Sequence, residues 1–515
     1  MGKVGGFLEV HRVGFDKREP AERVRDYKQY FRLQPEAELQ RQGGRCMDCG
    51  VPFCHEGCPL GNLIPDWNDL VYRGDWRGAL ERLHQTNNFP EFTGLICPAP
   101  CESACVLDIN DEAVTIEQIE LAIVERGWQE GWVVPRPPAE RTGRRVAVIG
   151  SGPAGLAVAA ELNSLGHEVA VYERDERPGG LLRFGVPDAK LEKWIIDRRV
   201  DVLRDEGIQF VCDVDVGTDL DANELQASND AVVVAIGSRV PRPLDVPGAD
   251  LAGVHPAMDY LYQRNRWVAG QEGRTARAVH EPITAAGKHV VVVGGGDTGM
   301  DCLSNAIREG AASTLMLDVY PEIPPSGRPD STPWPLPPKR TLTTYALDEG
   351  ARREWNSQVV GLEGEDGRVV RANGRRVVGT SSRDLQPVPD SEFTVPADLV
   401  LVAIGFSHPE HDGAVAQLRL DLDARGNVKA PVYGASRAKV FACGDARVGQ
   451  SLVVTAIAEG RKCARMVDRY LGGAELAVWD TSRDDGMHPL RDESETAGSV
   501  GAGDAFFTAP PPSAA

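Results

Sequence analysis

The sequence predicts an α/β protein in which a cysteine-rich helical segment precedes two similar units of parallel strands and helices. Two observations support this prediction. Of the 11 cysteines, seven lie between Cys46 and Cys105. An apolar strand, a glycine-rich turn and a helix follow one another twice, from Arg145 and again from His289. Since strand–turn–helix–strand patterns are typical of parallel sheets, the repeat indicates two α/β units.

The charge and hydropathy of the chain exclude several classes of protein. It has 56 Lys and Arg against 76 Asp and Glu, a net charge of −20, which disfavours binding to nucleic acid or anionic membranes. The most apolar stretch, residues 146–160, contains three glycines and is shorter than the roughly 18 residues of a membrane span. Near the N-terminus, Lys3 and Glu9 interrupt any apolar core of a signal peptide. We therefore expect a cytoplasmic protein.

The predicted helical domain spans residues 1–140. Helices are expected over residues 26–42, 76–85 and 115–126, and the last places Ile116, Ile119 and Ile123 on one face. Prolines at 135, 137 and 138 form a stiff linker after them.

The first α/β unit carries the pattern of a dinucleotide-binding loop. After the strand at 145–149 comes the sequence Gly150-Ser151-Gly152-Pro153-Ala154-Gly155. The first glycine makes the tight turn, the second lets the backbone approach a pyrophosphate, and the third packs the helix on the strand. The second strand ends at Glu173, the position from which an acid accepts hydrogen bonds from a ribose. A glycine turn without a ligand remains the alternative.

The second unit repeats the pattern and predicts a second, Rossmann-like site. Its loop contains Gly294, Gly296, Asp297, Thr298 and Gly299, and Asp318 ends the next strand, as Glu173 does in the first unit. Two such sites imply two dinucleotides, a bound flavin and a diffusible nicotinamide coenzyme.

Two later strands fit the first unit. Residues 231–236 form an apolar strand that ends at Gly237, and residues 439–442 run into Gly444 and Asp445. Asp445 could hold the ribityl or pyrophosphate part of a flavin, although a Gly-Asp pair alone is more often a turn.

The cysteine spacing indicates iron–sulfur clusters. The seven thiols are Cys46, Cys49, Cys54, Cys58, Cys97, Cys101 and Cys105. Cys58, the last of the first four, is followed directly by a proline. This resembles the bacterial iron–sulfur run, in which the fourth Cys serves the other cluster. Zinc is the alternative, but the gaps fit paired C-x2-C half-sites poorly. Two [4Fe–4S] clusters take four ligands each, so either the eighth ligand is another residue or one cluster is incomplete. Glu117 and Glu120 on the following helix are candidates, although spacing alone favours a solvated face. His55 is spaced to lie beside a cluster or on the surface rather than to bind iron.

Taken together, these motifs resemble the small (β) subunit of bacterial NADPH-dependent glutamate synthase. The resemblance covers about residues 1–475 and rests on the stretches GFLEV, RCMDCGVPFCHEGCPLGNLIPDWNDLVYRG, NNFPEFTGLICPAPCESACVLDIN, VTIEQIE, VAVIGSGPAGLA, GGLLRFGVPDAKLEK, VVVVGGGDTGMDC and FACGD. The related flavin domain of dihydropyrimidine dehydrogenase is similar in its cysteine and flavin patterns but lacks the GNLIPDWNDLV detail.

The resemblance implies a reaction in glutamate biosynthesis. NADPH would deliver a hydride to FAD, and two [4Fe–4S] clusters would carry the electrons to a large (α) subunit with FMN, which makes glutamate from glutamine and 2-oxoglutarate. It places Gly180 and Leu181 near the flavin. In the related dehydrogenase a glutamine on the matching helix binds iron, which implies Glu120 as the eighth ligand. Hydride transfer between cofactors needs no general base, so we assign no catalytic side chain.

Coenzyme choice is where the chain departs from the family. Many members have a basic pair after the second strand of the nicotinamide unit, whereas this chain has Asp318, Val319 and Tyr320. An acid there suits the free 2′-hydroxyl of NADH and repels a 2′-phosphate. Restoring positive charge would take one of the later basic residues, Arg328, Lys339 or Arg340. We expect NADPH, with NADH possible.

These patterns predict five segments. They are the cluster domain (1–140), the first part of the FAD domain (141–285), the NAD(P)H domain (286–398), the second part of the FAD domain (399–479) and a disordered acidic, proline-rich tail (480–515). Two other functions stay open: a related subunit serving ferredoxin or a dihydropyrimidine dehydrogenase partner, and a non-catalytic scaffold that binds zinc and nucleotide.

Overall fold

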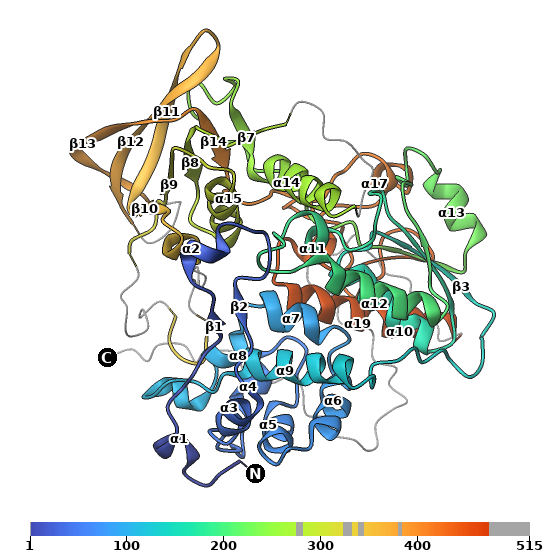
Figure 1. Cartoon of the computed structure of the whole chain (residues 1–515). Coiled ribbons are helices and arrows are strands. Elements are labelled where there is room, and N and C mark those ends of the chain that lie inside the picture. The colour runs from blue at the N-terminus through green and yellow to red at the C-terminus, as the bar shows by residue number, and fades with distance from the viewer. Residues whose placement is uncertain (1, 274–281, 323–331, 338–344, 380–383, 473–515) are drawn as a thin grey trace, which may run out of the picture. The chain divides into compact units, whose positions relative to one another are not determined.

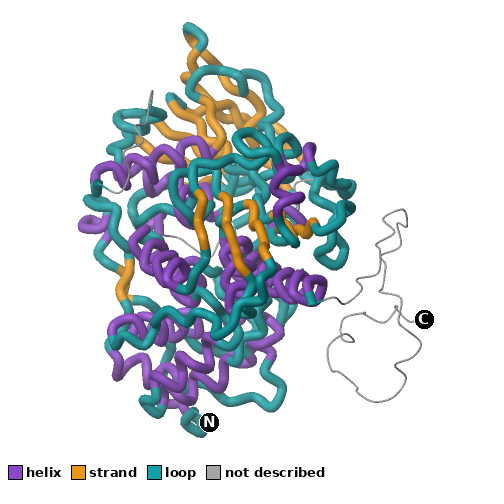
Figure 2. Tube along the Cα trace, turned by 90° about the vertical axis from the view of Figure 1, so that its right-hand side faces the viewer, coloured by secondary structure: helices purple, strands orange, loops and turns teal. Residues whose placement is uncertain are grey.

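The structure is a computed structural model that describes residues 2–273, 282–322, 332–337, 345–379 and 384–472 (Figure 1). The cysteine-rich part is helical, as predicted, and its helices lie together near the N-terminus (Figure 2). Its elements are α1 (Gly6–Glu9), β1 (Asp16–Lys17), α2 (Pro20–Arg23), β2 (Phe31–Arg32), α3 (Glu36–Gly43), α4 (Phe53–Gly57), α5 (Ile64–Tyr72), α6 (Trp76–His84), α7 (Pro90–Ile96), α8 (Pro100–Ser103), the 3-10 turn η1 (Val106–Ile109) and α9 (Ile116–Gln129).

Local sequence explains where these helices begin. α6 starts after Asp75, whose carboxylate accepts the N–H of Gly78 at 2.9 Å and so caps the helix. α9 buries Ile116, Ile119 and Ile123, as the apolar stripe predicts.

The prediction of one helix over residues 26–42 was wrong in its first half. The helix there, α3, begins only at Glu36, and residues 31–32 form β2, which pairs antiparallel with β1. Pro35 is the physical reason, because it has no N–H for an intrahelical hydrogen bond and disfavours the helical conformation of the residue before it.

The first α/β unit is a five-stranded parallel sheet in the order β15-β6-β3-β4-β5. Its central strands are almost wholly buried, because helices cover both faces of the sheet. The strands are β3 (Arg145–Ile149), β4 (Glu168–Tyr172), β5 (Gln209–Val211), β6 (Ala231–Val234) and β15 (Val440–Ala442), and the helices are α10 (Pro153–Ser164), α11 (Leu181–Phe184), α12 (Lys193–Asp205), α13 (Ala222–Ser228), α17 (Ala414–Gln417), α18 (Asp445–Val448) and α19 (Val453–Leu471).

The second unit is another five-stranded parallel sheet, in the order β10-β9-β8-β14-β7. It consists of β7 (Val254–Pro256), α14 (Ala257–Gln271), β8 (His289–Val293), α15 (Asp297–Arg308), β9 (Ser313–Leu317), α16 (Tyr345–Asp348), β10 (Arg352–Glu354) and β14 (Leu399–Val402).

The strand pairing corrects two of the predicted domain limits. β14 was assigned to the second part of the FAD domain, but it pairs with β8 of the second sheet. β7, assigned to the first part of the FAD domain, pairs with β14. An apolar run such as Leu399–Val402 fits either buried parallel sheet, so the sequence alone could not choose between them.

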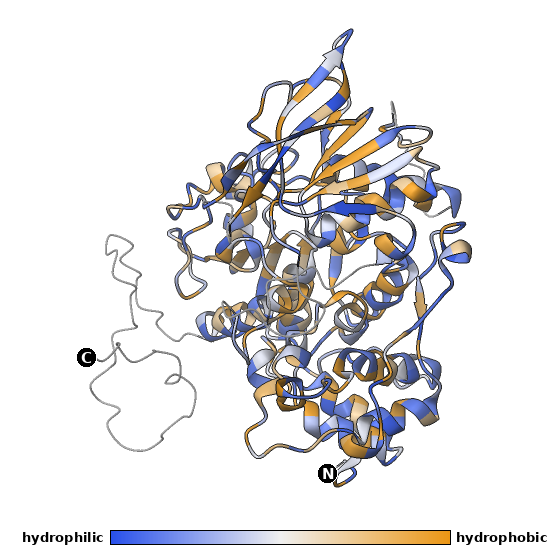
Figure 3. Cartoon of the chain, turned by 90° about the vertical axis from the view of Figure 1, so that its left-hand side faces the viewer, coloured by the Kyte–Doolittle hydropathy of each residue, from blue (hydrophilic) through white to orange (hydrophobic). Residues whose placement is uncertain are grey.

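A three-stranded antiparallel sheet, which the sequence analysis missed, lies between β10 and β14. Its strands are β11 (Ser357–Glu365), β12 (Arg368–Val378) and β13 (Gln386–Pro396). Hydrophilic and hydrophobic residues are mixed along these strands (Figure 3), and Val359, Leu362, Val369 and Ala372 pack on the core of the second unit.

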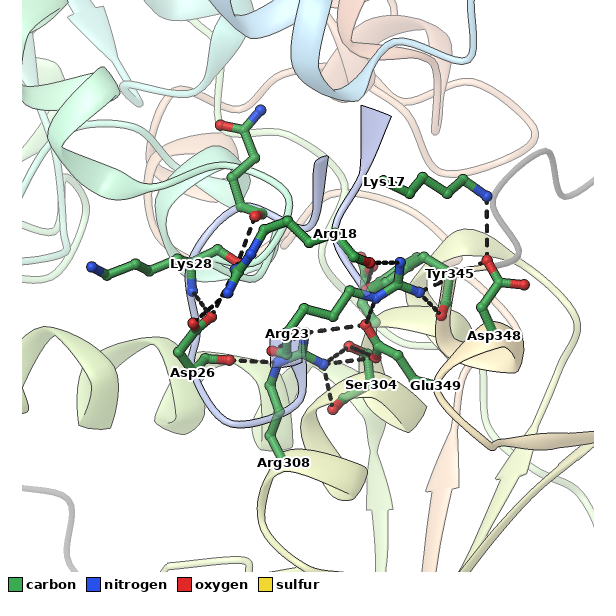
Figure 4. Close-up of polar contacts among 12 residues, drawn as sticks. Lys17, Arg18, Arg23, Asp26, Lys28, Ser304, Arg308, Tyr345, Asp348 and Glu349 are labelled. Carbon is green, nitrogen blue, oxygen red and sulfur yellow. Dashed lines mark hydrogen bonds and ion pairs between the residues drawn. The ribbon is translucent and has the colours of Figure 1, made fainter. Parts of the chain in front are cut away.

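A buried cluster of charges attaches the segment around α2 to the second unit (Figure 4). Arg23 Nε donates to Glu349 Oε1 at 2.8 Å, and Arg308 Nη1 donates to Glu349 Oε2 at 2.7 Å. All three side chains are at most 1% exposed. Two guanidinium groups from elements far apart in the chain thus share one carboxylate.

Within the described residues, no helix combines the length and the apolar character needed to cross a bilayer. The predicted tail at 480–515 lies outside the described residues and stays a prediction.

Candidate redox site

One cavity of about 350 Å³ brings together residues from the cysteine-rich helical part, the first α/β unit and the second α/β unit. The loop after β3 and the N-terminal turn of α15 line it, and so do Ile96 and Pro98, which flank Cys97. Of the residues predicted to bind the two dinucleotides, those in its wall are Gly150, Gly152, Pro153, Ala154, Glu173, Gly180, Leu181, Gly237, Asp297, Thr298 and Asp445. Those outside the wall are Gly155, Gly294, Gly296, Gly299, Asp318 and Gly444.

The first glycine loop has the geometry of a phosphate cradle. Gly150 has a φ of +100°, and a Cβ there would lie 2.5 Å from the carbonyl oxygen of Ala235. A Cβ on Gly155 would lie 2.0 Å from the carbonyl oxygen of Gly150, so only glycine lets α10 pack this close. At Gly152, by contrast, a Cβ would meet no protein atom within 4 Å. This open position at the N-terminus of α10 is where an anion can approach the backbone.

Glu173 lies directly behind this loop, after the end of β4. Its carboxylate accepts the N–H of Ser151 at 3.0 Å and the N–H of Asp175 at 2.9 Å, and it also accepts the Ser151 hydroxyl. Burial raises the pKa of Glu173 above its ordinary value, although these hydrogen bonds oppose the shift. All of these donors are neutral groups.

Two turns close the same cavity. Gly180 has a φ of +51°, and its Cβ would lie 2.9 Å from the Cα of Gly152, so this turn touches the loop. A Cβ on Gly444 would lie 2.7 Å from the Cβ of Ala154, so the turn after β15 lies on α10. Burial raises the pKa of the adjacent Asp445 to about 6, and Ser451 donates to its carboxylate at 2.6 Å.

The second glycine loop repeats the first. Gly294 has a φ of +116°, and its Cβ would lie 2.4 Å from the carbonyl oxygen of Ala403. A Cβ on Gly299 would lie 2.8 Å from the carbonyl oxygen of Gly294. Gly296 is again the open position, with no atom within 4 Å. In both loops, therefore, the second glycine of the fingerprint, Gly152 or Gly296, is the one with space for a ligand.

The acid of the second unit has a partner that the sequence analysis missed. Asp318 is 2% exposed and forms an ion pair with Arg353 on β10. Arg328, Lys339 and Arg340, the basic residues considered for this place, lie outside the described residues. Arg353 could have been found as the partner of Asp318 only if the pairing of β10 with β9 had been known. That pairing is not visible in the sequence.

The cysteines divide into two groups. Cys46, Cys49, Cys54 and Cys105 line one small apolar hollow, whereas Cys58 does not. The charge of Glu120 acts on each of the other three thiols, Cys58, Cys97 and Cys101.

These surroundings fit thiolates held by a cationic metal group. Burial raises the pKa of Cys46 and of Cys58 to about 11, and it raises the pKa of Cys97 well above the ordinary value. A thiol in such a place loses its proton only beside a strong positive charge. No three His, Cys, Asp or Glu side chains in the described part of the chain are close enough together to hold one metal ion. An iron–sulfur cube is larger than one ion and needs wider spacing.

Glu120 and Glu117 lie on the same helix but differ in their contacts. Glu120 Oε1 accepts Asn87 Nδ2 at 2.9 Å and also the Thr93 hydroxyl, and burial raises the pKa of Glu120 to about 7. The charge of Glu117 adds to the raised pKa of Cys97. Burial raises the pKa of Glu117 as well, and the nearby charge of Glu102 adds to the shift. Glu120 is therefore the carboxylate common to Cys58, Cys97 and Cys101.

Comparisons with known proteins agree with both parts of this site. Residues 144–460 match the family described as pyridine nucleotide-disulphide oxidoreductase, and residues 23–132 match dihydropyrimidine dehydrogenase domain II, 4Fe-4S cluster. The chain is 48% identical to the glutamate synthase [NADPH] small chain of Mycobacterium tuberculosis, covering 92% of this chain and 97% of that protein. The chain belongs to the glutamate synthase small-chain family.

Other members of the family confirm its extent. The small chain of Bacillus subtilis is 42% identical, with 92% of this chain and 100% of that protein covered. A glutamate synthase [NADH] of Schizosaccharomyces pombe is 45% identical over 93% of this chain and 23% of that longer protein. Some of these relatives are therefore named for NADPH and others for NADH.

Solved structures support the fold of the α/β part. FprA of Mycobacterium tuberculosis in complex with NADPH has a TM-score of 0.50 and 18% identity, covering 64% of this chain and 85% of that one. Family membership makes the chain a flavin and iron–sulfur oxidoreductase, which excludes the non-catalytic zinc scaffold.

Proposed function

We propose that the chain is the electron-input subunit of glutamate synthase. It oxidises NADPH at FAD and passes the electrons through two [4Fe–4S] clusters to a large subunit that carries FMN and makes glutamate from glutamine and 2-oxoglutarate. The observation that carries this proposal is the shared cavity. Its wall contains the first glycine loop, Asp297 and Thr298 of the second loop, and both neighbours of Cys97.

The residues of the first unit would hold FAD. The loop and the N-terminus of α10 bind the pyrophosphate, with Gly152 as the position of closest approach. Glu173 would accept hydrogen bonds from the ribose, and Asp445 would hold the ribityl chain or the pyrophosphate. Bound FAD supplies a hydride acceptor that can release electrons one at a time. The chain itself positions the two cofactors and excludes water, so no side chain needs to act as an acid or base.

The two cysteine groups give the electron path a direction. One ligand set consists of Cys58, Cys97, Cys101 and Glu120. It lies next to the cavity, because both chain neighbours of Cys97, Ile96 and Pro98, line the cavity wall. Cys46, Cys49, Cys54 and Cys105 form the other. Electrons would enter at the first set and leave from the second towards the large subunit.

Anaerobic stopped-flow reduction of the holoprotein by NADPH, and separately by NADH, tests the proposal. We expect the flavin absorbance to bleach first and the broad iron–sulfur absorbance to follow. Added large subunit should then support glutamate formation, whereas a ferredoxin or a dihydropyrimidine dehydrogenase partner should not accept electrons at a comparable rate. A flavin that neither coenzyme reduces would contradict the proposal.

A further inference from the structure

The two dinucleotide units of this chain treat their ribose-binding acids differently. Glu173 in the first unit accepts hydrogen bonds from a hydroxyl and two backbone N–H groups, all neutral. Asp318 occupies the equivalent place in the second unit, but its carboxylate forms an ion pair with Arg353. The first acid thus keeps an uncompensated negative charge when ionised, and the second does not.

The contacts of Arg353 fix its guanidinium at the second loop. Its Nη2 donates to the carbonyl oxygen of Gly295 at 3.0 Å as well as to Asp318. The guanidinium carbon lies 3.5 Å from the centre of the Trp355 ring, so the group is stacked on one side. Its side chain is 6% exposed. A rigid, buried fork of this kind holds its charge in one place.

Asp318 in turn touches the loop that would carry the coenzyme. An ideal Cβ on Gly295 would lie 2.0 Å from Asp318 Oδ2, so the carboxylate is in contact with the middle of the loop. A lone carboxylate at this place accepts the 2′-hydroxyl of NADH and repels the 2′-phosphate of NADPH. Paired with Arg353, it has neither a net charge nor a free Oδ2 for that purpose.

We infer that Arg353 is a specificity-determining residue for the coenzyme, because it neutralises Asp318 and so permits NADPH. The inference rests on the proposed function, since it concerns the coenzyme that reduces the flavin. It also explains how an acid at the end of β9 is compatible with a phosphorylated coenzyme. Arg353 acts through Asp318 and is a positioning residue in the second unit.

The test is a set of equilibrium titrations of the full-length holoprotein with NADP⁺ and with NAD⁺, giving the ratio of the two affinities. Arg353→Met should shift this ratio at least tenfold towards NAD⁺, because it frees the Asp318 carboxylate. The matched control is Arg352→Met, which removes the same charge from the adjacent residue, whose side chain is 73% exposed. It should leave the ratio within threefold of the wild-type value.

The double variant Asp318→Asn/Arg353→Met separates this role from a merely structural one. If Arg353 acts through Asp318, the double variant should return to within threefold of the wild-type ratio. An Arg353→Met protein that loses affinity for both coenzymes equally, or keeps the wild-type ratio, would overturn the inference.

If Arg353→Met does not fold, the affinity ratio of the single variant Asp318→Asn tests the inference. It leaves Arg353 without its counter-charge and should move the ratio towards NADP⁺, and an unchanged ratio would overturn the inference. Failure of the proposed function has a different signature, in which neither reduced coenzyme bleaches the flavin of the wild-type protein.

Discussion

At the scale of single residues, Gly152 provides a direct test of where the flavin lies. Its φ of −65° is one that alanine adopts, and its Cβ position is empty. We expect Gly152→Ala to weaken FAD binding about tenfold and to change the stability of the flavin-free protein by less than about 0.5 kcal/mol. Flavin titration and denaturant unfolding measure the two effects. Gly155→Ala is the contrasting variant, which should lose stability because its Cβ meets a carbonyl oxygen at 2.0 Å.

Glu120 can be distinguished from Glu117 by its effect on iron content. Glu120→Ala should lower iron and sulfide to about half of the wild-type values, because one cluster loses a ligand. Glu120→Gln should keep both clusters, since an amide oxygen can replace the carboxylate. Glu117→Ala is the matched control on the same helix. Equal iron content in Glu120→Ala and wild-type protein would rule out Glu120 as a ligand.

Asp445 should make the flavin-free protein less stable as the pH rises. Its pKa in the folded protein is about 6, raised by burial from an ordinary value of 3.8. The folded state therefore holds a proton that the unfolded state releases, and the stability from this proton is lost as the pH rises from about 4 to 6. Relative to Asp445→Asn, the wild-type free energy of unfolding should fall by roughly 2 kcal/mol between pH 4 and 7. A difference that does not change with pH would show that Asp445 does not titrate in this range.

At the scale of elements, short-range patterns were predicted well and long-range pairing was not. The strands β3, β4, β8 and β9 and the helix α9 follow from apolar runs and periodicity, which the local sequence contains. The membership of β14 depends on partners far away in the chain. The hairpin of β11 and β12 is the exception among local patterns, because its two-residue Asp366-Gly367 turn is a short-range signal that the sequence analysis overlooked. The pairing of Arg353 with Asp318 needs the register of β10 against β9, so sequence reasoning could place the acid but not its counter-charge.

The attachment of α2 to the second unit centres on one buried carboxylate. Glu349→Gln would remove the nearest counter-charge of both Arg23 and Arg308, and would leave Arg23 with only Asp348, at 3.8 Å. We expect a loss of about 3–5 kcal/mol in stability and faster proteolysis between residues 16 and 35. The neighbouring variant Asp348→Asn is the comparison. Its carboxylate also pairs with this segment, with Lys17 at 3.2 Å and Arg23 at 3.8 Å, but it is 40% exposed and should contribute less than about 1 kcal/mol. Unchanged protease sensitivity in Glu349→Gln would show that other contacts hold the segment.

At the scale of the whole molecule, the cavity joins three sites that the sequence predicts separately. The glycine loops and the cysteines could each be found from spacing and residue type. Their meeting at one cavity, with Ile96 and Pro98 in its wall, is a property of the tertiary structure. The same is true of the division of the cysteines, since Cys105 joins Cys46, Cys49 and Cys54 although the helices α5 to α8 lie between them in the chain.

This arrangement predicts that loss of either cluster blocks electron flow at a different point. In Cys97→Ser, NADPH should still bleach the flavin, but electrons should remain there, because the ligand next to the cavity is lost. In Cys105→Ser, the flavin and the cluster of Cys58, Cys97 and Cys101 should both become reduced, while transfer to the large subunit stops. Stopped-flow absorbance with freeze-quench electron paramagnetic resonance follows both steps, and flavin content shows that each variant is folded. If Cys105→Ser instead stopped electrons at the flavin and Cys97→Ser did not, the order of the two clusters would be the reverse of the one proposed.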